Sequence, residues 1–386
     1  MNWRMKSERS WGRLGMKFDT IKLSELAAIQ TGPFGSQLHK EDYVVHGTPI
    51  VTVEHLGSRK FTEQNLPCVS DKDKERLKKY VLKTGDIVFS RVGSVDRCSY
   101  VSAEYEGWMF SGRCLRVRPC EKLNPEYLYY FFLLEKTKQF VRNIATGATM
   151  PSINTKFMGE IPIRVPSLDA QNKIASILWM IDDKIELNKK INKNLEQQAQ
   201  AIYSRMFIEH RQESWSTGQL SDLISVKYGK DHKKLADGNY PVYGSGGIMR
   251  YVEKPLYTGE SVLIPRKGTL NNIMYVNEAF WSVDTMFYTE MLRPNIAKFE
   301  YHFVKSKDLV SLNAGSAVPS MTTNILNAMQ LYIPNEKTLE KFENIVSPMY
   351  SAMQENTKES KILANTRDAL LPKLMSGELD VSDIDL

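Results

Sequence analysis

The sequence lacks the features that mark membrane, secreted and metal-binding proteins. It has no run of about 18 or more apolar residues, so we expect no membrane-spanning helix. The segment 1–23 contains basic residues but not the apolar stretch of a secretory signal. The four cysteines (Cys68, Cys98, Cys114 and Cys120) include no CxxC pair, and the six histidines are scattered, so no metal site is predicted. We therefore predict a reduced, cytoplasmic protein that binds no metal.

Motifs of the common catalytic sites are also missing. The sequence has no GxxxxGK[ST] phosphate loop, no HExxH metal motif and no GxGxxG dinucleotide turn. Asn124-Pro125-Glu126-Tyr127 resembles the D/N-P-P-Y/F loop of amino-methyltransferases, but its third residue is acidic and the segment is predicted to open a helix. The GSGG segment at 244–247 is interpreted as a turn, or as a place where the backbone approaches a binding partner closely. We therefore predict no catalytic site and no cofactor.

The composition is that of a soluble globular chain with a small positive charge. Of 386 residues, 42% are hydrophobic and 25% are charged, which suits two or three folded domains. Lys and Arg number 51 against 45 Asp and Glu, a net charge of +6 that only mildly favours a polyanion as partner. The first residues are unlike the rest of the chain. We expect residues 1–17 to form a disordered extension, with Met16 a candidate for the natural start.

The chain contains an internal repeat, which organises the prediction of its fold. Short segments from the first half return in the same order in the second half. The pairs are LSELAAIQTG from Leu23 with LSDLISVKYG from Leu220, GDIVFSRVGS from Gly85 with GESVLIPRKGT from Gly259, Tyr100-Val101 with Tyr275-Val276, Arg118-Pro119 with Arg293-Pro294, PEYLYYFFL from Pro125 with FEYHFVKSK from Phe299, and TGATMPSI from Thr146 with AGSAVPSM from Ala314. We therefore interpret the chain as two copies of one unit with loops of different length.

Each copy is predicted to hold a mixed α/β domain followed by a long helix. Short apolar runs bounded by Gly, Pro and Asp predict strands. From Asp169 to about His210, and from Lys337 to about Leu374, apolar residues recur with the 3.5-residue period of a coiled coil. Each stripe also suits packing on a globular core. Equal length, matched phase and a polar seam position near the middle of each, such as Asn192 and Asn356, favour pairing, which chain order makes antiparallel.

At these residues the sequence resembles the specificity subunits of type I restriction-modification systems. LSELAAIQTGPFGSQLHKEDYVVHGTPIVTVEHLG from Leu23 is similar to the start of that family's first target-recognition domain, GDIVFSRVG to its central strand, and YPVYGSGGI from Tyr240 to its second domain. IPIRVPSLDAQNKIASIL resembles the entry into the first conserved helix, although Asp169-Ala170-Gln171 departs from the usual Glu-Gln. TRDALLPKLMSGEL from Thr366 is similar to the C-terminal close.

The resemblance implies an α+β fold with two mixed α/β target-recognition domains in pseudo-two-fold repeat, separated by a long antiparallel coiled-coil helix pair. The expected boundaries are 18–166 for the first domain, 167–212 for the first spacer helix, 213–334 for the second domain, and 335–386 for the second helix and C-terminal tail. Implied partners are double-stranded DNA with a bipartite target, two adenine methyltransferase subunits, and nuclease-translocase subunits bound through them. A helix of some 40 residues is about 60 Å long, so the helices would act as a ruler between half-sites.

Candidate DNA contacts are the basic, amide and aromatic side chains of the two globular parts. They are Lys40, His55, Arg59, Lys60, Arg91, Arg97 and Arg113 in the first domain, and Lys230, Lys233, Lys234, Tyr243, Arg250, Arg266, Lys267, Asn271 and Asn272 in the second. Arg91 and Arg266 are favoured because they occupy equivalent places beside Gly93 and Gly268, although each would also suit a role in bracing that turn. The repeated GxxxPS element (Thr146, Gly147, Pro151 and Ser152; Gly315, Pro319 and Ser320) is interpreted as shaping a loop.

Two other functions stay open from the sequence. A methyltransferase or nuclease with a fused recognition region would need motifs that are missing, and methylation by the isolated chain would reveal it. A scaffold whose twin domains bind proteins would differ from a DNA reader in showing no salt-dependent DNA binding.

Overall fold

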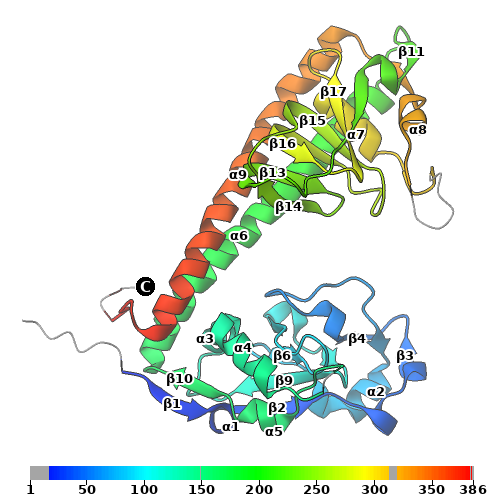
Figure 1. Ribbon diagram of the computed structural model, residues 1–386. Coiled ribbons are helices and arrows are strands. Elements are labelled where there is room, and N and C mark those ends of the chain that lie inside the picture. Colours follow the sequence, from blue (N-terminus) through cyan, green and yellow to red (C-terminus); the bar gives the residue numbers. More distant parts are fainter. Residues whose placement is uncertain (1–16, 148, 313–319, 383, 385–386) are drawn as a thin grey trace, which may run out of the picture. The chain divides into compact units, whose positions relative to one another are not determined.

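The computed structural model describes residues 17–147, 149–312, 320–382 and 384, without the side chains of residues 36 and 40. The expected disordered extension therefore lies outside the described residues, apart from Lys17. The chain forms two compact units, Met1–Leu187 with Glu359–Leu386 (unit 1) and Asn188–Lys358 (unit 2). Both are mixed α+β (Figure 1).

Unit 1 contains two four-stranded sheets and a two-stranded ribbon. One sheet has the order β2-β9-β6-β7, with β2 Ala27–Thr31, β9 Cys114–Pro119, β6 Ile87–Ser90 and β7 Cys98–Tyr100. The other has the order β3-β5-β4-β8, with β3 Tyr43–Val44, β5 Cys68–Val69, β4 Thr48–Val51 and β8 Met109–Phe110. The ribbon pairs β1 (Asp19–Lys22) with β10 (Pro162–Val165). The parallel pairing of β4 with β8 is the exception among otherwise antiparallel neighbours.

The α-helices within unit 1 are α1 (Leu23–Leu26), α2 (Asp71–Arg76), α3 (Pro125–Leu133), α4 (Glu135–Ile144) and α5 (Thr155–Gly159). Helices α1 and α5 contact β2 of the first sheet, α3 contacts β7 and β9, and α4 packs against α3. Asn124 begins α3 by accepting a hydrogen bond from the Tyr127 backbone, with Pro125 in the first turn. Asn followed by Pro is a strong helix start, so the Asn-Pro-Glu-Tyr segment caps a helix.

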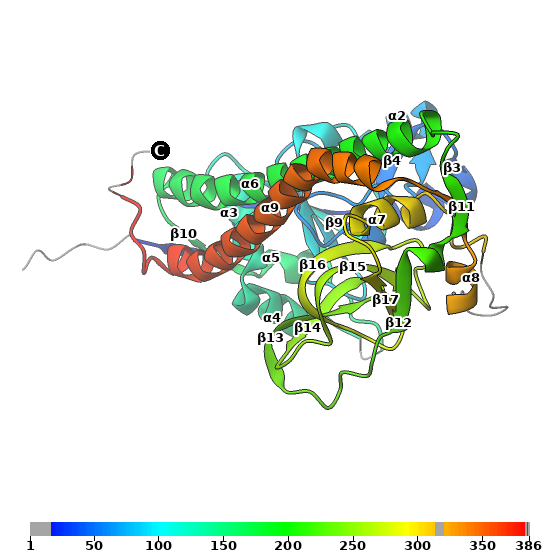
Figure 2. The same ribbon diagram turned by 90° about the horizontal axis from the view of Figure 1, so that it is seen from above.

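Unit 2 contains one six-stranded sheet and a second two-stranded ribbon (Figure 2). The sheet order is β12-β17-β15-β16-β13-β14, with β12 Ile224–Tyr228, β17 Met286–Met291, β15 Tyr257–Pro265, β16 Met274–Ser282, β13 Asp237–Gly244 and β14 Gly247–Val252. The ribbon pairs β11 (Ser216–Gln219) with β18 (Gln330–Ile333). The GSGG segment is the turn between β13 and β14, as expected from the sequence. Two short helices complete the unit, α7 (Ala297–Lys305) and α8 (Thr323–Asn327).

Two long helices each contribute to both units. The first, α6, runs from Leu168 to Tyr203 and continues as a π-helical turn, Ser204–Glu209, and the second, α9, runs from Glu336 to Ser376. Apolar seam residues predicted from the sequence are buried in each unit, such as Ile174 and Leu178 in unit 1 and Phe342 and Val346 in unit 2. Within the described ranges, no helix is both long and apolar enough to cross a membrane.

Polar contacts join α6 to α9 inside each unit. In unit 2 the Asn192 amide donates to the Met353 carbonyl oxygen at 3.1 Å, and the Asn188 amide donates to the Asn356 carbonyl oxygen at 3.3 Å. The partner number on α9 therefore falls as the number on α6 rises. In unit 1 the Arg367 guanidinium binds the Asp182 carboxylate at 2.5 Å.

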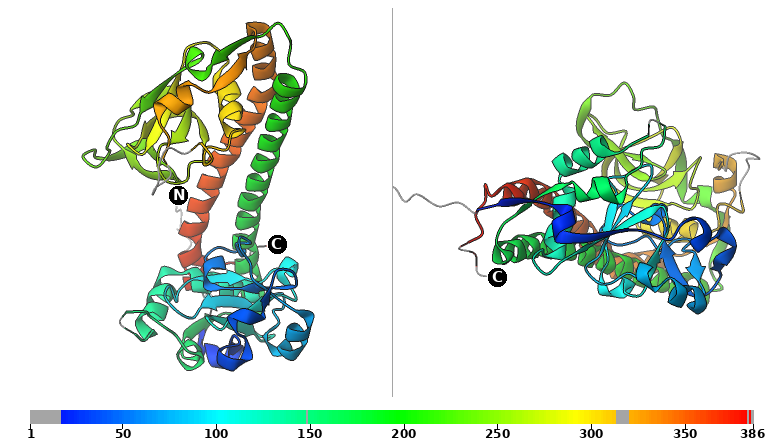
Figure 3. Two further views of the ribbon diagram at one scale, coloured as in Figure 1. Left: turned by 90° about the vertical axis from the view of Figure 1, so that its right-hand side faces the viewer. Right: turned by 90° about the horizontal axis from the view of Figure 1, so that it is seen from below.

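Helix α7 lies between the sheet of unit 2 and the long helices (Figure 3, left). Its His302 ring is fully buried, with Nδ1 2.8 Å from the Gln200 amide oxygen on α6 and Nε2 2.9 Å from the Tyr350 hydroxyl on α9. Lys298, also on α7, is 4% exposed and binds Glu343 of α9 at 2.6 Å. These contacts fix α7, and with it the sheet, on the helices of the same unit.

Strand pairing corrects two of the correspondences drawn from the sequence. Pro119 pairs with Ala27 at the end of β9, and the residue in the same place in unit 2 is Met291, which pairs with Ile224. The Arg293-Pro294 pair lies in the loop after β17 and is not the counterpart of Arg118-Pro119. By the same count Pro125, which opens α3, corresponds to Ala297, which opens α7, and not to Phe299. Short motifs of common residues match by chance where loop lengths differ.

Candidate nucleic-acid interface

In unit 1 the loop after β6 holds Arg91 firmly by its backbone. The Arg91 N–H donates to the Arg113 carbonyl oxygen at 2.8 Å, and the Ile153 N–H donates to the Arg91 carbonyl oxygen at 3.0 Å. The Arg91 guanidinium donates to the Gly112 carbonyl oxygen at 3.1 Å and lies over the Phe34 ring, 5.7 Å from its centre. Phe34 itself is 59% exposed. The arginine thus joins a loop carbonyl to a large exposed ring.

In unit 2 the loop after β15 holds Arg266 through the same set of contacts. The Arg266 N–H donates to the Thr285 carbonyl oxygen at 2.9 Å, and the Met321 N–H donates to the Arg266 carbonyl oxygen at 2.9 Å. The guanidinium donates to the Asp284 carbonyl oxygen at 3.4 Å and lies over the Tyr228 ring, 5.3 Å from its centre. Tyr228 is 51% exposed. The two units therefore present an arginine over an exposed ring at matching loops.

The geometry suits both roles considered for Arg91 and Arg266, which are contact with DNA and bracing of the turn. Each guanidinium makes a hydrogen bond that braces its loop, as in the structural interpretation. A guanidinium has five N–H donors in a fixed plane, however, and Arg91 and Arg266 are both partly exposed. Donors therefore remain for a ligand. Gly93 and Gly268, two residues further on, both have positive φ (73° and 88°) and turn the chain there.

Glycine is required directly after β2 and after β12, where the chain passes close to the loops that precede β9 and β17. A Cβ on Gly32 would lie 2.1 Å from the Ser111 carbonyl oxygen, and one on Gly229 would lie 2.0 Å from the Val283 carbonyl oxygen. Both contacts are far shorter than van der Waals separation. The repeated glycine that ends LSELAAIQTG and LSDLISVKYG thus permits the close backbone approach that forms this edge of each unit.

Several predicted cations lie on the surface. Arg113, Lys230, Lys233, Lys234 and Lys267 are exposed, and none forms an ion pair with a carboxylate of the described residues. Lys267 lies in the loop next to Arg266, where its backbone pairs with that of Ser320 in an isolated antiparallel β-bridge. Arg113 follows Gly112 in the loop that receives Arg91. These side chains can reach a polyanion without first breaking an ion pair.

Other candidates of unit 1 are engaged within the protein. Arg59 is 13% exposed, binds Asp183 of α6 at 2.6 Å and lies over the Trp179 ring at 4.6 Å. Lys60 forms an ion pair with Glu104. Arg97 donates to the Leu56 carbonyl oxygen. Arg59 therefore fastens its loop to α6, and the geometry gives it a structural role.

Three candidates of unit 2 also hold loops in place. Arg250 binds the Asp237 carboxylate at 2.6 Å across the β13–β14 hairpin. The Asn272 amide donates to the Ser245 carbonyl oxygen at 2.6 Å, which fixes the GSGG turn beside the Arg266 loop. The Asn271 side-chain oxygen accepts from the Leu309 N–H at 3.0 Å.

His55 and Tyr243 do not fit the expected DNA contacts, because both are buried. His55 is 1% exposed, and its Nδ1 accepts from the Thr52 N–H at 2.9 Å. Tyr243 is 9% exposed and its hydroxyl donates to Glu278. Burial and the Glu278 carboxylate together raise the pKa of Tyr243. The side chain of Lys40 lies outside the described part of the chain, and so do Gly315 and Pro319 of the second GxxxPS element.

The sequence prediction missed Phe34 and Tyr228. Both are aromatic residues directly before a glycine, within TGPFG and VKYG. An aromatic residue beside a glycine turn has little around it to bury it, and that was the available signal. It was overlooked because Tyr243 was the aromatic residue chosen, and residue type alone does not show which ring is exposed.

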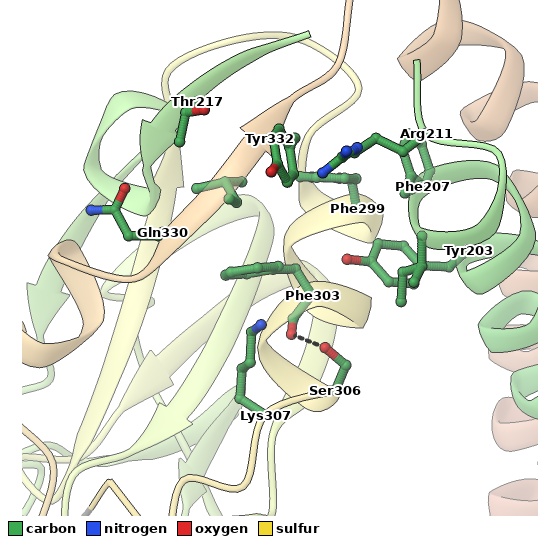
Figure 4. Close-up of a pocket in the computed structure, with 12 residues that line it drawn as sticks. Tyr203, Phe207, Arg211, Thr217, Phe299, Phe303, Ser306, Lys307, Gln330 and Tyr332 are labelled. Atoms are coloured by element: carbon green, nitrogen blue, oxygen red, sulfur yellow. Dashed lines mark hydrogen bonds between the residues drawn. The ribbon is translucent and has the colours of Figure 1, made fainter. Parts of the chain in front are cut away.

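A separate pocket of about 380 Å³ lies in unit 2 between the π-helical turn, the end of α7 and β18 (Figure 4). Arg211 lies over the Tyr332 ring at 3.9 Å, and Lys307 lies over the Phe303 ring at 4.6 Å. None of the residues that line the pocket is acidic, and none belongs to the predicted DNA contacts. Among the described residues, no group of three or more His, Cys, Asp or Glu side chains is placed to hold a metal ion.

Comparison with known proteins gives a consistent result. A family model described as the type I restriction modification DNA specificity domain matches residues 16–197 and 212–363. The chain is 33% identical over 381 residues to the putative type I restriction enzyme MjaX specificity subunit of Methanocaldococcus jannaschii, covering 87% of this chain and 88% of that one. It is 21% identical over 425 residues to the MjaIX specificity subunit of the same organism, covering 98% and 97%.

A solved structure agrees in fold. The type I restriction-modification S subunit from M. genitalium aligns with a TM-score of 0.61 and 17% identity, covering 96% of this chain and 99% of that one. Two glycine-edged α+β units, matching arginine loops and a family match in both halves lead to one conclusion. The chain belongs to the type I restriction-modification DNA specificity family, as a specificity subunit.

Proposed function

We propose that this chain selects the DNA target of its complex by reading a bipartite sequence, one half with each unit. The observation that carries the proposal is the recurrence of one arrangement in both units: an arginine fixed by two backbone hydrogen bonds beside a glycine turn, over an exposed ring. Two similar surfaces on one chain suit two half-sites. The comparisons support DNA specificity and not the alternative of a protein-binding scaffold.

The proposed recognition domains are 18–166 and 213–334, in pseudo-two-fold repeat. The shared strand order β2-β9-β6-β7 and β12-β17-β15-β16 supports this repeat. So does the pairing of Ile87 with Tyr100 in one unit and of Val262 with Tyr275 in the other. Contacts to phosphate would come from the exposed cations described above, and contacts to bases from the arginine loops.

We take segments 167–212 and 335–386 to contain the two spacer helices, paired as an antiparallel coiled coil. The hydrogen bonds of Asn192 to Met353 and of Asn188 to Asn356, and the Arg367–Asp182 ion pair, support antiparallel pairing. Helices of 36 and 41 residues measure about 54 and 62 Å. That length is ample to set an unread gap between half-sites about one duplex turn, roughly 34 Å, apart.

The proposed partners are double-stranded DNA, two adenine methyltransferase subunits, and nuclease-translocase subunits that join through them. In this family the catalytic steps belong to the other subunits of the complex. Large apolar side chains exposed on the long helices, such as Met180, Leu187 and Ile362 at 54%, 50% and 65%, support protein docking there.

Co-expression with the methyltransferase subunit in a methylation-free host tests the proposal. We expect genome-wide mapping of N6-methyladenine to show methylation confined to one split motif. A soluble complex that methylates no motif, or methylates adenines without sequence preference, would contradict it. The isolated chain serves as the control and should give no methylation.

A further inference from the structure

We propose that Phe34 and Tyr228 are specificity-determining residues, each of which presses its ring against the bases of the half-site that its unit reads. Arg91 and Arg266 act with them, holding the ring from one side and reaching the same half-site with their remaining donors. This inference rests on the proposed function and adds the side chains that make the apolar contact in each unit.

The first support is the exposure of the two rings. Phe34 is 59% exposed and Tyr228 is 51% exposed, more than other aromatic side chains on the described surface such as Tyr332 at 43% and Phe140 at 37%. Aromatic rings carry a large apolar surface whose transfer out of water is favourable. A ring left in water on a surface that carries cations is well placed to be buried by a duplex, whose base edges offer apolar groups such as the thymine methyl.

The second support is that each ring is already oriented. Arg91 lies 5.7 Å from the centre of the Phe34 ring, and its guanidinium is tied to the Gly112 carbonyl oxygen. Arg266 lies 5.3 Å from the centre of the Tyr228 ring and is tied to the Asp284 carbonyl oxygen. A guanidinium held over a ring limits the motion of both groups. Less conformational freedom is then lost when they contact a ligand.

The third support is the open space around each ring. A Cβ added at Gly35 or Gly93 would meet no atom of the described residues within 4 Å, so the space beside the backbone is open at these two positions next to the Phe34–Arg91 pair. In unit 2 the same holds for Gly246 and Gly247 of the GSGG turn. That turn lies beside the Arg266 loop, since a Cβ on Gly268 would meet the Ser245 hydroxyl at 3.2 Å. Bare backbone beside a projecting ring lets a duplex approach closely.

The two rings reach this arrangement from different chain positions. Phe34 follows Gly32 by two residues, whereas Tyr228 directly precedes Gly229. Gly32 and Gly229 hold the same place, because their N–H groups donate to the Cys114 and Met286 carbonyl oxygens at 3.1 and 3.0 Å. A ring under the equivalent arginine is therefore present in both units without coming from the same residue of the repeat. A repeated sequence motif does not explain why both units have such a ring, whereas the same contact with DNA in both units does.

The test uses the complex reconstituted with the methyltransferase subunit and the split motif found by methylation mapping. Phe34→Ala and Tyr228→Ala are compared with Phe140→Ala and Tyr332→Ala, which remove exposed rings elsewhere on the same units. Fluorescence anisotropy at fixed salt measures affinity for three duplexes: the full target, a target with one half scrambled, and a target with the other half scrambled. Thermal unfolding of each variant checks that the fold is unchanged.

We expect Phe34→Ala to weaken binding to the full target about ten-fold, the size of one lost base contact. It should leave unchanged the affinity for the duplex in which the half read by unit 1 is scrambled. Tyr228→Ala should show the same pattern for the other half. Phe34→Tyr and Tyr228→Phe should bind as the wild type does, and so should both control variants.

Two results would overturn the inference. One is unchanged affinity of both alanine variants on all duplexes. The other is an equal loss on every duplex, which would make the rings part of a contact that carries no sequence information. If the wild-type complex itself shows no preference for the full target over the scrambled duplexes, the proposed function fails, and this inference fails with it.

Discussion

Acidification should loosen α7 through His302. The His302 ring is fully buried between Gln200 on α6 and Tyr350 on α9. Burial, with a smaller effect of the Lys305 ammonium, lowers its pKa from 6.5 to about 4 against the opposing effect of the Glu196 carboxylate. The folded unit therefore keeps this histidine neutral at a pH where the unfolded chain protonates it.

The sign and the size follow from this difference. A histidine whose folded pKa lies below its unfolded value stabilises the fold above pH 6.5, and that stability is lost as the pH falls towards 4. The full loss is about 3 kcal/mol, and about 2 kcal/mol of it has occurred at pH 5. Glu196 and Glu260 have lowered pKa values and stay ionised across the window from pH 7.5 to pH 5.

Hydrogen exchange of the α7 amides, corrected for intrinsic rates, measures this loss directly. The opening free energy of α7 in the wild type should fall by about 2 kcal/mol more between pH 7.5 and pH 5 than in His302→Gln, which cannot titrate. His210→Gln, a substitution at an exposed histidine of the same unit, should behave as the wild type. Equal pH dependence in the wild type and in His302→Gln would refute the reasoning.

The remaining predictions concern a buried acid and the two required glycines. Glu300 is fully buried, and burial raises its pKa well above 4.5, so its contribution to stability is present below that pH and is lost as the pH rises. Glu300→Gln should therefore gain thermal stability over the wild type at pH 8.5 relative to pH 5.5, and an unchanged difference between the two pH values would count against this. Gly32→Ala and Gly229→Ala should each destabilise their own unit by about 3 kcal/mol or more, because the new Cβ meets a backbone oxygen. Gly246→Ala, where the added Cβ meets nothing within 4 Å, should unfold as the wild type does in urea, and similar losses in all three variants would contradict the steric argument.

Periodicity carried the prediction of the long helices. A 3.5-residue apolar pattern needs no knowledge of distant contacts, and α6 and α9 begin at Leu168 and Glu336, within a residue or two of the expected starts. The Asn-Pro start of α3 and the GSGG turn were equally local signals. Where neighbouring residues in the chain determine the backbone conformation, the sequence was enough to predict it.

Burial of polar side chains was not accessible in the same way. His55 and Tyr243 were chosen for chemistry that suits DNA, but Gln64 and Glu278, which satisfy them in the interior, lie 9 and 35 residues away. The pairing of Arg59 with Asp183, 124 residues away, is also a tertiary contact. Residue type cannot distinguish an exposed cation from one already engaged. The sequence therefore located the loops of the candidate surface but not which side chains are available on it.

The alignment of the two halves met a related limit. Matching Arg118-Pro119 with Arg293-Pro294 shifted the expected counterpart of α3 in unit 2 by two residues, because the sequence does not show where β17 ends. Strand register supplied that position, and the side-chain contacts showed an exposed ring beside each of the two arginines already matched from the sequence. Phe34 and Tyr228 do not occupy equivalent positions of the repeat, so aligning the two halves could not pair them.

The most direct test of the account lengthens both long helices. Four residues are inserted at Asn192 in α6 and four at Asn356 in α9, residues that hydrogen-bond to each other, so that pairing on either side is kept. The insertion adds about 6 Å of helix, and the duplex rises about 3.4 Å per base pair. A four-residue insertion after the exposed Lys254 is the control and should leave the methylation map unchanged. The account predicts methylation at the same two half-sites with a gap longer by about one or two base pairs. An active variant that keeps the original gap, or reads different half-site sequences, would contradict it.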